Sequence, residues 1–216
     1  MKEKQPAVLR ECGNFQELIR EAREEERTIT GYRFFRIIGD PQDVNTMPDF
    51  PPEFQNCVFE NCRLSGYGFH GAYFADVLFR ECDLSNADFS GSLFRRVRFE
   101  SCKAVGADFT ESVWEHTTVL DCSCSMANLA GAKLKHTTLE QSDFSGGGFR
   151  QCVFQSVSFQ HCRLTRAELF QTPLKGINFT TCDIGGIVLS GEELRGAIVT
   201  PEQACDLSHF LGLIIR

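Results

Sequence analysis

The chain has 216 residues, of which 42% are hydrophobic, so it is long and apolar enough to bury a core and is not expected to be disordered. With 29 acidic and 22 basic residues the net charge is −7, which disfavours a broad phosphate-binding surface and direct nucleic-acid binding. Because no signal peptide begins the chain and no segment approaches the ~20 apolar residues that span a bilayer, we expect a cytoplasmic protein without a membrane partner.

The first 53 residues are predicted to form two segments. Residues 1–28 are charged, and 14–27 favour a helix in which Asn14 is the N-cap and Glu17 stands three positions on. Residues 29–53 are predicted to hold a partial first coil, with Ile29 and Phe34 inside, followed by a proline-rich loop over 40–52.

A period of five residues dominates the chain over 54–199. From Phe54 to Val199 every fifth residue is apolar, which makes thirty consecutive positions, and a second column two residues earlier holds small side chains. Neither the helical period of 3.6 nor the strand period of 2 fits this pattern. A chain that turns a corner after every fifth residue does fit the pattern. Each five-residue side then has two positions that point inward and three that point outward, and four sides make one coil. Glycine recurs at the expected corners, where it adopts a positive φ at little cost.

The repeated units resemble the pentapeptide-repeat family, whose consensus is A(D/N)LXX. The segments 87–91 and 107–111 read Ala-Asp-Phe-Ser-Gly and Ala-Asp-Phe-Thr-Glu, and 127–131 reads Ala-Asn-Leu-Ala-Gly. The resemblance implies an all-β solenoid, a right-handed quadrilateral β-helix of short parallel strands. Seven and a half coils at ~4.8 Å each predict a rod about 36 Å long.

The cysteines and histidines are interpreted as structural. Eight of the 11 cysteines fall in the small inward column, where free cysteine is a common buried residue. His116 and His136 are separated by one predicted coil and should stack at one corner, which leaves a weak metal site as the alternative. No cofactor, metal centre or catalytic group is expected, since the polar residues face outward along a smooth rod, and we predict that the protein is not an enzyme.

Charged residues gather unevenly on the four predicted sides. The first acidic side, centred on Phe59, Phe79 and Phe99, has a net charge of −3, and so does the second acidic side, centred on Phe69, Phe89 and Phe109, which lies opposite. The first carries Glu60, Glu81, Glu100, Asp121 and Glu140 against Arg80 and Arg98, and the second carries Asp88, Asp108, Glu111 and Glu168 against Arg150. The remaining two sides hold ten basic and seven acidic residues, with Arg95, Arg96, Lys133, Lys135 and Lys175 concentrated on one. The alternative is ordinary solvated surface on which Asp and Asn cap the turns.

Residues 200–216 are predicted to form a C-terminal helix and tail. Thr200 is the expected N-cap, Pro201 takes the first helical position and Gln203 completes a capping box. Ala204, Leu207, Phe210 and Leu211 form an apolar stripe that should cover the open end of the core. The segment resembles the C-terminal module of the quinolone-resistance (Qnr) branch of pentapeptide-repeat proteins. That resemblance implies a tail-to-tail homodimer, with an interface that includes Leu207, Phe210, Leu211, Leu213 and Ile214.

The resemblance to the Qnr branch also implies a function. It implies a bacterial protein that binds DNA gyrase or topoisomerase IV as a DNA mimic, with the acidic sides in place of phosphates. Plasmid-borne Qnr proteins interrupt the rod with projecting loops, whereas residues 54–199 run without interruption, so topoisomerase contact is more expected here than drug protection. The alternative is an interaction scaffold with an unrelated target, because a fold does not determine a function.

Overall fold

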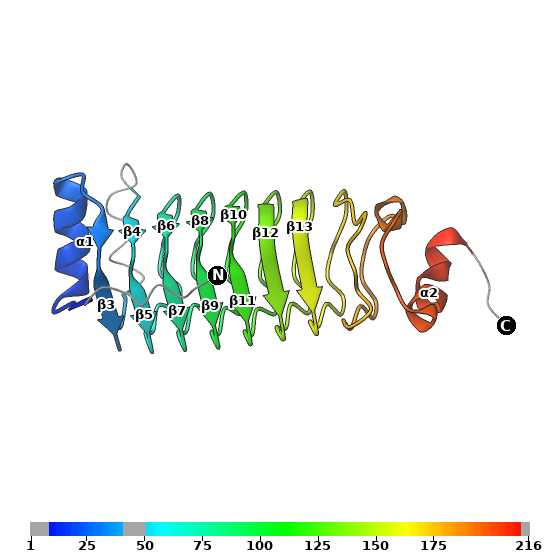
Figure 1. The fold of residues 1–216 in the computed structure, drawn as a ribbon, viewed down its shortest axis with the longest axis horizontal. Coiled ribbons are helices and arrows are strands. Elements are labelled where there is room, and N and C mark those ends of the chain that lie inside the picture. The colour runs from blue at the N-terminus through cyan, green and yellow to red at the C-terminus, as the bar shows by residue number, and fades with distance from the viewer. Residues whose placement is uncertain (1–8, 41–50, 213–216) are drawn as a thin grey trace.

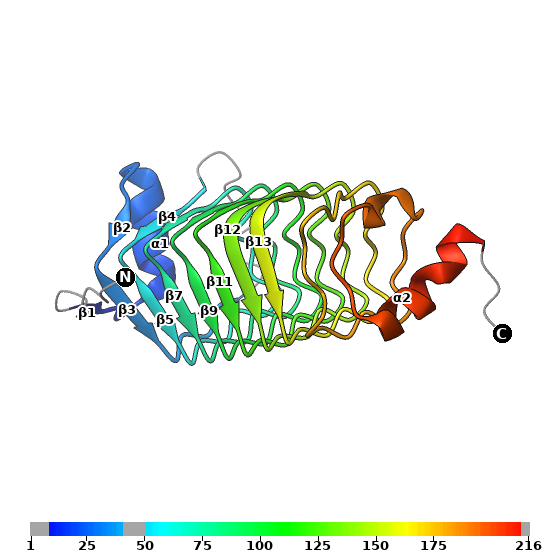
Figure 2. The ribbon, with the colours of Figure 1, turned by 45° about the vertical axis from the view of Figure 1, so that its right-hand side comes forward.

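The computed structural model describes residues 9–40 and 51–212, and it shows a right-handed quadrilateral β-helix in which successive coils stack into a rod (Figure 1). Helix α1 (Phe15–Glu24) lies at one end of the rod and helix α2 (Pro201–Leu207) at the other (Figure 2). The predicted solenoid is therefore confirmed.

Two ladders of parallel strands form two adjacent sides of the rod. One ladder joins β1 (Arg10–Glu11), β3 (Tyr32–Phe35), β5 (Val58–Glu60), β7 (Leu78–Arg80), β9 (Arg98–Glu100) and β11 (Thr118–Leu120). The other joins β2 (Ile29–Thr30), β4 (Glu53–Gln55), β6 (Tyr73–Ala75), β8 (Leu93–Arg95) and β10 (Val113–Glu115). Both ladders continue into β12 (Lys133–Glu140) and β13 (Val153–Gln160), each of which turns the corner between the two sides. The other two sides are held by isolated parallel bridges such as Asp83↔Lys103.

The register of the ladders follows the predicted four-sided coil. Phe74 pairs with Phe94 and Trp114 with Leu134, so that each residue meets its equivalent in the next coil. At the N-terminus the first coil is longer, because Ile29 pairs with Phe54 across the segment that includes residues 41–50. The first coil begins at Ile29, as the phase of the period indicates.

The core is a stack of large side chains, one from each side of every coil. Phe69, Phe89 and Phe109 lie over one another with ring centroids 5.0 and 5.1 Å apart and planes within 9° of parallel. Phe89 is fully buried, and the rings of Phe74 on an adjacent side and Phe79 on the opposite side meet it at 63° and 79°. Offset stacked and edge-on contacts are the favourable arrangements of aromatic rings, so the narrow interior explains the many phenylalanines at inward positions.

The inward cysteines act as small buried donors. The thiol of Cys82 donates to the carbonyl oxygens of Phe59 (3.4 Å) and Arg80 (3.3 Å), and Cys102 makes the same contacts one coil later. On another side Ser92 uses its hydroxyl in the same way, donating to the carbonyl of Phe69 at 2.7 Å. At these positions the small column holds a compact side chain that satisfies a carbonyl oxygen, whereas Ala87 and Val97 fill other positions of the column without a donor.

Many corners are left-handed whether or not they hold glycine. Glu81, Met126 and His136 have φ values of 52°, 60° and 50°, beside glycine corners such as Gly91 at 64°. Side chains with a Cβ pay a steric cost there, so the stacking of the coils outweighs the local backbone preference at these positions.

The two helices cover the ends of the rod differently. Asn14 caps α1 through a hydrogen bond from the Glu17 amide, and Phe15, Leu18 and Ile19 are buried against the first coil. At the other end Thr200 and Gln203 form the predicted capping box of α2, which continues into a 3-10 turn, η3 (Ser208–Leu211). No residue of α2 is fully buried.

Candidate functional site

The first acidic side holds two carboxylates that are already neutralised. Glu60, on β5, accepts hydrogen bonds from Arg33 at 2.9 and 2.5 Å. Glu100, on β9, forms ion pairs with Arg80 (3.2 Å) and Arg98 (2.6 Å). Both carboxylate side chains are less than one fifth exposed, so neither presents a free charge to a partner.

The free charges of this side lie at the corner that ends it. Glu81 and Asp121 are exposed corner residues two coils apart, with Ser101 between them donating to Asp121 at 3.1 Å. Glu140, at the end of β12, is half-buried. No ion pair joins any of these three carboxylates to a cation within the described part of the chain.

On the second acidic side most of the carboxylates serve the structure. Asp88 accepts from the Ser90 amide at 2.9 Å, and Asp108 accepts in the same way from Thr110, so each closes its own turn. Glu168 pairs with Arg150 at 2.6 Å. Glu111 is the exposed member, at a corner with φ of 56°. Half-buried Asp88, Asp108 and Glu168 thus offer less charge than their number implies.

A signal for these pairs is present in the sequence. Equivalent positions stack on adjacent coils, and opposite charges at that spacing meet in Arg80–Glu100, Asp76–Arg96, Asp83–Lys103 and Asp143–Arg163. Counting charges by side does not reveal these four pairs, whereas comparing each charge with its equivalent one coil away does. That comparison does not find Arg33–Glu60 or Arg150–Glu168, which are 27 and 18 residues apart.

The C-terminal residues predicted to form a dimer interface are only partly described. Leu207 and Phe210 are half-buried and pack against the core. The side chain of Leu211 and all of Leu213 and Ile214 lie outside the described residues, and Ala204 of the predicted stripe is exposed. Gln203 holds α2 to the last coil, because its amide donates to the carbonyls of Phe179 (3.0 Å) and Cys182 (2.8 Å).

A buried carboxylate in the last coil was not anticipated from the sequence. Glu193, in the short 3-10 turn η2 (Glu192–Leu194), is 8% exposed and accepts hydrogen bonds from the Gln171, Ser190 and Gly191 amides at 2.9–3.0 Å. Burial raises the pKa of Glu193, but the hydrogen bonds from Gln171 and Ser190 outweigh it, so the pKa lies below its usual value. Glu193 is therefore a structural anion.

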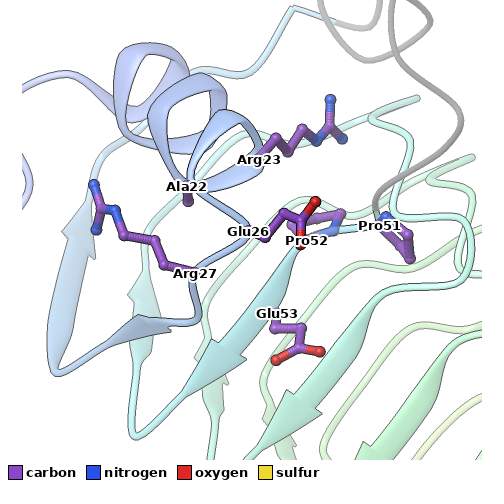
Figure 3. A pocket seen from close by; sticks show the side chains of 7 residues that line it. All are labelled: Ala22, Arg23, Glu26, Arg27, Pro51, Pro52 and Glu53. Atoms are coloured by element: carbon purple, nitrogen blue, oxygen red, sulfur yellow. The ribbon is translucent and has the colours of Figure 1, made fainter.

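The surface is less smooth than predicted. A cavity of about 250 Å³ lies between the end of α1 and the start of β4, lined by Ala22, Arg23, Glu26, Arg27, Pro51, Pro52 and Glu53 (Figure 3). Arg23 and Arg27 extend in opposite directions, and Arg27 is paired with Glu21 and Glu25. The cavity therefore brings no set of converging groups together.

The stacked histidines, the metal-ligating side chains and the helices bear on whether the chain has a metal site or a membrane span. His116 and His136 stack as predicted, with ring centroids 4.8 Å apart and planes 15° from parallel. Over residues 9–40 and 51–212 no three His, Cys, Asp or Glu side chains are grouped to hold a metal ion. Among the same residues no helix is both long and apolar enough to cross a membrane.

Comparisons with known proteins agree with the repeat. Residues 52–129 match a family described as "Pentapeptide repeat region" and residues 116–147 match "Pentapeptide repeats (8 copies)". No curated protein matches the sequence significantly.

Solved structures of similar fold come from several sources. Trypsin-treated QnrB1, a plasmid-mediated fluoroquinolone resistance protein, is 17% identical over 87% of this chain and 99% of its own, with a TM-score of 0.37. HetL of the cyanobacterium Nostoc sp. strain PCC 7120, involved in heterocyst differentiation regulation, is 14% identical over 79% of this chain and 86% of its own, with a TM-score of 0.32. A thylakoid-lumen protein of Arabidopsis thaliana is 22% identical over 53% of this chain and 69% of its own, with a TM-score of 0.31. At these identities the likenesses assign no function to the chain.

Proposed function

We propose that this chain, which is a pentapeptide-repeat protein, binds DNA gyrase or topoisomerase IV through its exposed carboxylates and modulates the enzyme as a DNA mimic. The observation that carries the proposal is the set of exposed, unpaired carboxylates Glu81, Glu111 and Asp121 on a rod of regular spacing. The resemblance of the C-terminal segment to the Qnr branch supports the choice of partner.

The rod carries too little negative charge to imitate a DNA duplex along its whole length. Duplex DNA carries one negative charge per ~1.7 Å of its axis, which amounts to nearly three charges over the ~4.8 Å of one coil. Glu81 and Asp121 lie two coils apart, so their row supplies far less than this. We therefore propose contact at a few fixed positions, with a weaker salt dependence than the binding of DNA to the same enzyme.

A gyrase supercoiling assay, with and without ciprofloxacin across a protein concentration series, tests the proposal. Inhibition without drug is expected, and recovery of supercoiling under drug would add protection. The discriminating variant is Glu81→Lys with Asp121→Lys, because Glu100 is already paired. Its matched control is Glu24→Lys with Glu192→Lys, two exposed residues near the ends of the chain. Each pair moves the net charge from −7 to −3, since every replacement adds two units.

The variants separate specific contact from general charge. Loss of inhibition in the first pair alone supports the proposal, and equal loss in both pairs contradicts it. If the unmodified protein has no effect on gyrase, the second candidate takes its place: an interaction scaffold with another target. The pairing of Glu60, Glu100 and Glu168 with arginines favours that candidate, because it withdraws charge from both acidic sides.

We also propose a homodimer through α2 and the tail. Half-buried Leu207 and Phe210 leave apolar surface at an end of the rod where the last coil is incompletely covered. Phe210→Asp is expected to lower the mass measured by sedimentation equilibrium, whereas Asp206→Lys on the exposed face of the helix should not. A monomeric unmodified protein would contradict the dimer.

A further inference from the structure

One side of the rod is built from β4, β6, β8, β10 and the first halves of β12 and β13. We call it the basic side, and its cations have no part in the proposed topoisomerase contact. Figure 1 shows these strands side by side along the rod, as their pairing requires. In its middle, Arg95, Arg96, Lys133 and Lys135 face two carboxylates, Asp76 and Glu115.

The ion pairs of this side leave an excess of positive charge. Arg96 is neutralised, because its guanidinium makes two hydrogen bonds of 2.6 Å to Asp76. Arg95 and Lys135 share Glu115 at 4.0 and 3.7 Å, so one carboxylate serves two cations. Lys133 stacks between Val113 and Val153 rather than beside an acid. This side therefore carries two excess positive charges, one on Lys133 and one shared between Arg95 and Lys135.

An exposed apolar row runs beside these cations. Tyr73, Leu93 and Val113 are stacked in register, and the row continues past Lys133 to Val153. Leu93 is 39% exposed and Val153 is 56% exposed. Outward positions of a solvated strand ordinarily hold polar residues, so a row of this kind next to an excess of positive charge is typical of a surface that receives an amphipathic partner.

The neighbouring sides argue against nucleic acid as that partner. In chain order the basic side lies between the second acidic side and the first acidic side of the next coil, and β12 passes directly from Lys133 to Glu140. A duplex would meet exposed Glu111 on one flank and half-buried Glu140 on the other, and phosphates gain nothing from Leu93 or Val153. A protein helix about 10 Å wide is narrow enough to avoid the flanks and apolar enough to use the row.

The spacing of the coils favours a helical partner segment over an extended one. Equivalent positions recur every ~4.8 Å along the rod, close to the ~5.4 Å of one helical turn, whereas side chains on one face of a strand recur every ~6.6 Å. A helix lying along the rod can thus place one apolar residue over each coil for several coils.

We propose that the basic side binds an acidic amphipathic α-helix of a partner protein. Its apolar stripe lies over Leu93, Val113 and Val153, and its carboxylates meet Lys133 and Lys135. Glu81 and Asp121 lie at a different corner of the rod, whereas Glu111 borders this side two residues before Val113. The inference does not depend on a topoisomerase as partner.

Fluorescence anisotropy with the purified full chain tests the proposal. The probe is a labelled peptide that repeats leucine at helical spacing among glutamates. A scrambled peptide of the same composition and a short labelled DNA duplex are the comparison probes. Binding of the amphipathic peptide should be at least about ten-fold tighter than that of the scrambled one, because only the former aligns its leucines with the apolar row.

Variants locate the binding. Lys133→Glu with Lys135→Glu should weaken peptide binding about ten-fold or more, and Val153→Ser should weaken it without changing charge. The control on the opposite side is Lys103→Gln with Arg163→Gln, which changes the charge as much as Lys133→Gln with Lys135→Gln and adds no carboxylate beside Asp83 or Asp143. Lys133→Gln with Lys135→Gln, a milder change, should give an intermediate loss and guards against misfolding of the first variant.

Three results would overturn the proposal. One is equal binding of the ordered and scrambled peptides, including no binding of either. Another is equal weakening by the variants on the basic side and on the opposite side, which would indicate only long-range charge. The third is tighter binding of the DNA duplex than of the peptide, which would assign the surface to nucleic acid.

Discussion

Replacement of Cys102 tests whether the column of cysteines is structural. Cys102 is 3% exposed and lies between Cys82 and Cys122, and its thiol donates to the carbonyl oxygens of Phe79 and Glu100 at 3.5 and 3.4 Å. If the column needs only a compact donor, serine should replace it well. Ser142 already occupies the same column one coil beyond Cys122, donating to the Glu140 carbonyl at 2.7 Å.

The expected costs follow from the contacts. Cys102→Ser keeps the donor and exchanges a weak hydrogen bond for a stronger one, so the free energy of unfolding should fall by no more than about 1 kcal/mol. Cys102→Val removes the donor and adds a branch to a closely packed interior, which should cost about 1–3 kcal/mol. If the thiols were instead joined by a metal or by redox chemistry that stabilises the fold, both variants would lose that bond and serine would be tolerated no better than valine.

Urea unfolding followed by the fluorescence of Trp114 measures both variants. Trp114 is the single tryptophan of the chain, is 2% exposed, and lines the same part of the interior as Cys102. A loss of more than about 3 kcal/mol for Cys102→Ser, or a larger loss than for Cys102→Val, would refute the structural interpretation.

Four further predictions concern the core, a corner, a buried acid and the cap. Phe89→Ala should lower the free energy of unfolding by about 3–5 kcal/mol and Phe89→Leu by less than about 1.5, and equal urea midpoints for the two would contradict the stacking account. Met126→Gly, at a corner with φ of 60°, should stabilise by about 0.5–1 kcal/mol, whereas a lower Tm would show that the left-handed corner carries no steric cost. Because the pKa of Glu193 is lowered by folding, its stabilisation is present above about pH 4.5 and is lost as the pH falls through its folded-state value, so urea midpoints should fall less on acidification in Glu193→Gln than in the unmodified protein. Gln203→Ala removes two hydrogen bonds to the last coil and should speed amide exchange in α2 without affecting β6, and unchanged exchange in α2 would show that other contacts hold it.

The fold was largely predictable because its inward positions repeat. One large residue and one small residue in every five face the interior, and each lies directly over its equivalent in the adjacent coil. The start of the first coil at Ile29 and the stacking of His116 on His136 both followed from phase alone. Caps at Asn14 and Thr200 followed from local hydrogen-bonding chemistry.

Other features of the structure could not be predicted from the five-residue period. Glu60 stands opposite Phe35, and its partner Arg33 lies two residues out of register in the longer first coil, so a comparison of equivalent positions misses the pair. The burial of Glu193 depends on a 3-10 turn that departs from the repeat and turns backbone amides toward the carboxylate. Left-handed corners at residues with a Cβ arise because coil stacking imposes the turn on whatever side chain stands there.

Stacking also indicates where a function on this fold should be sought. Any outward charge lies about 4.8 Å from its equivalents in the coils before and after it, so an opposite charge there forms a pair and a like charge there is destabilising. Charges that serve only solubility can satisfy this rule by alternating, as Asp83 and Lys103 do. Glu111 lies instead between Gly91 and Gly131, and Lys133 between Val113 and Val153. These positions keep a full charge that the ladder could have neutralised, which is why the two proposed binding surfaces are built on such isolated charges rather than on the most acidic or most basic side as a whole.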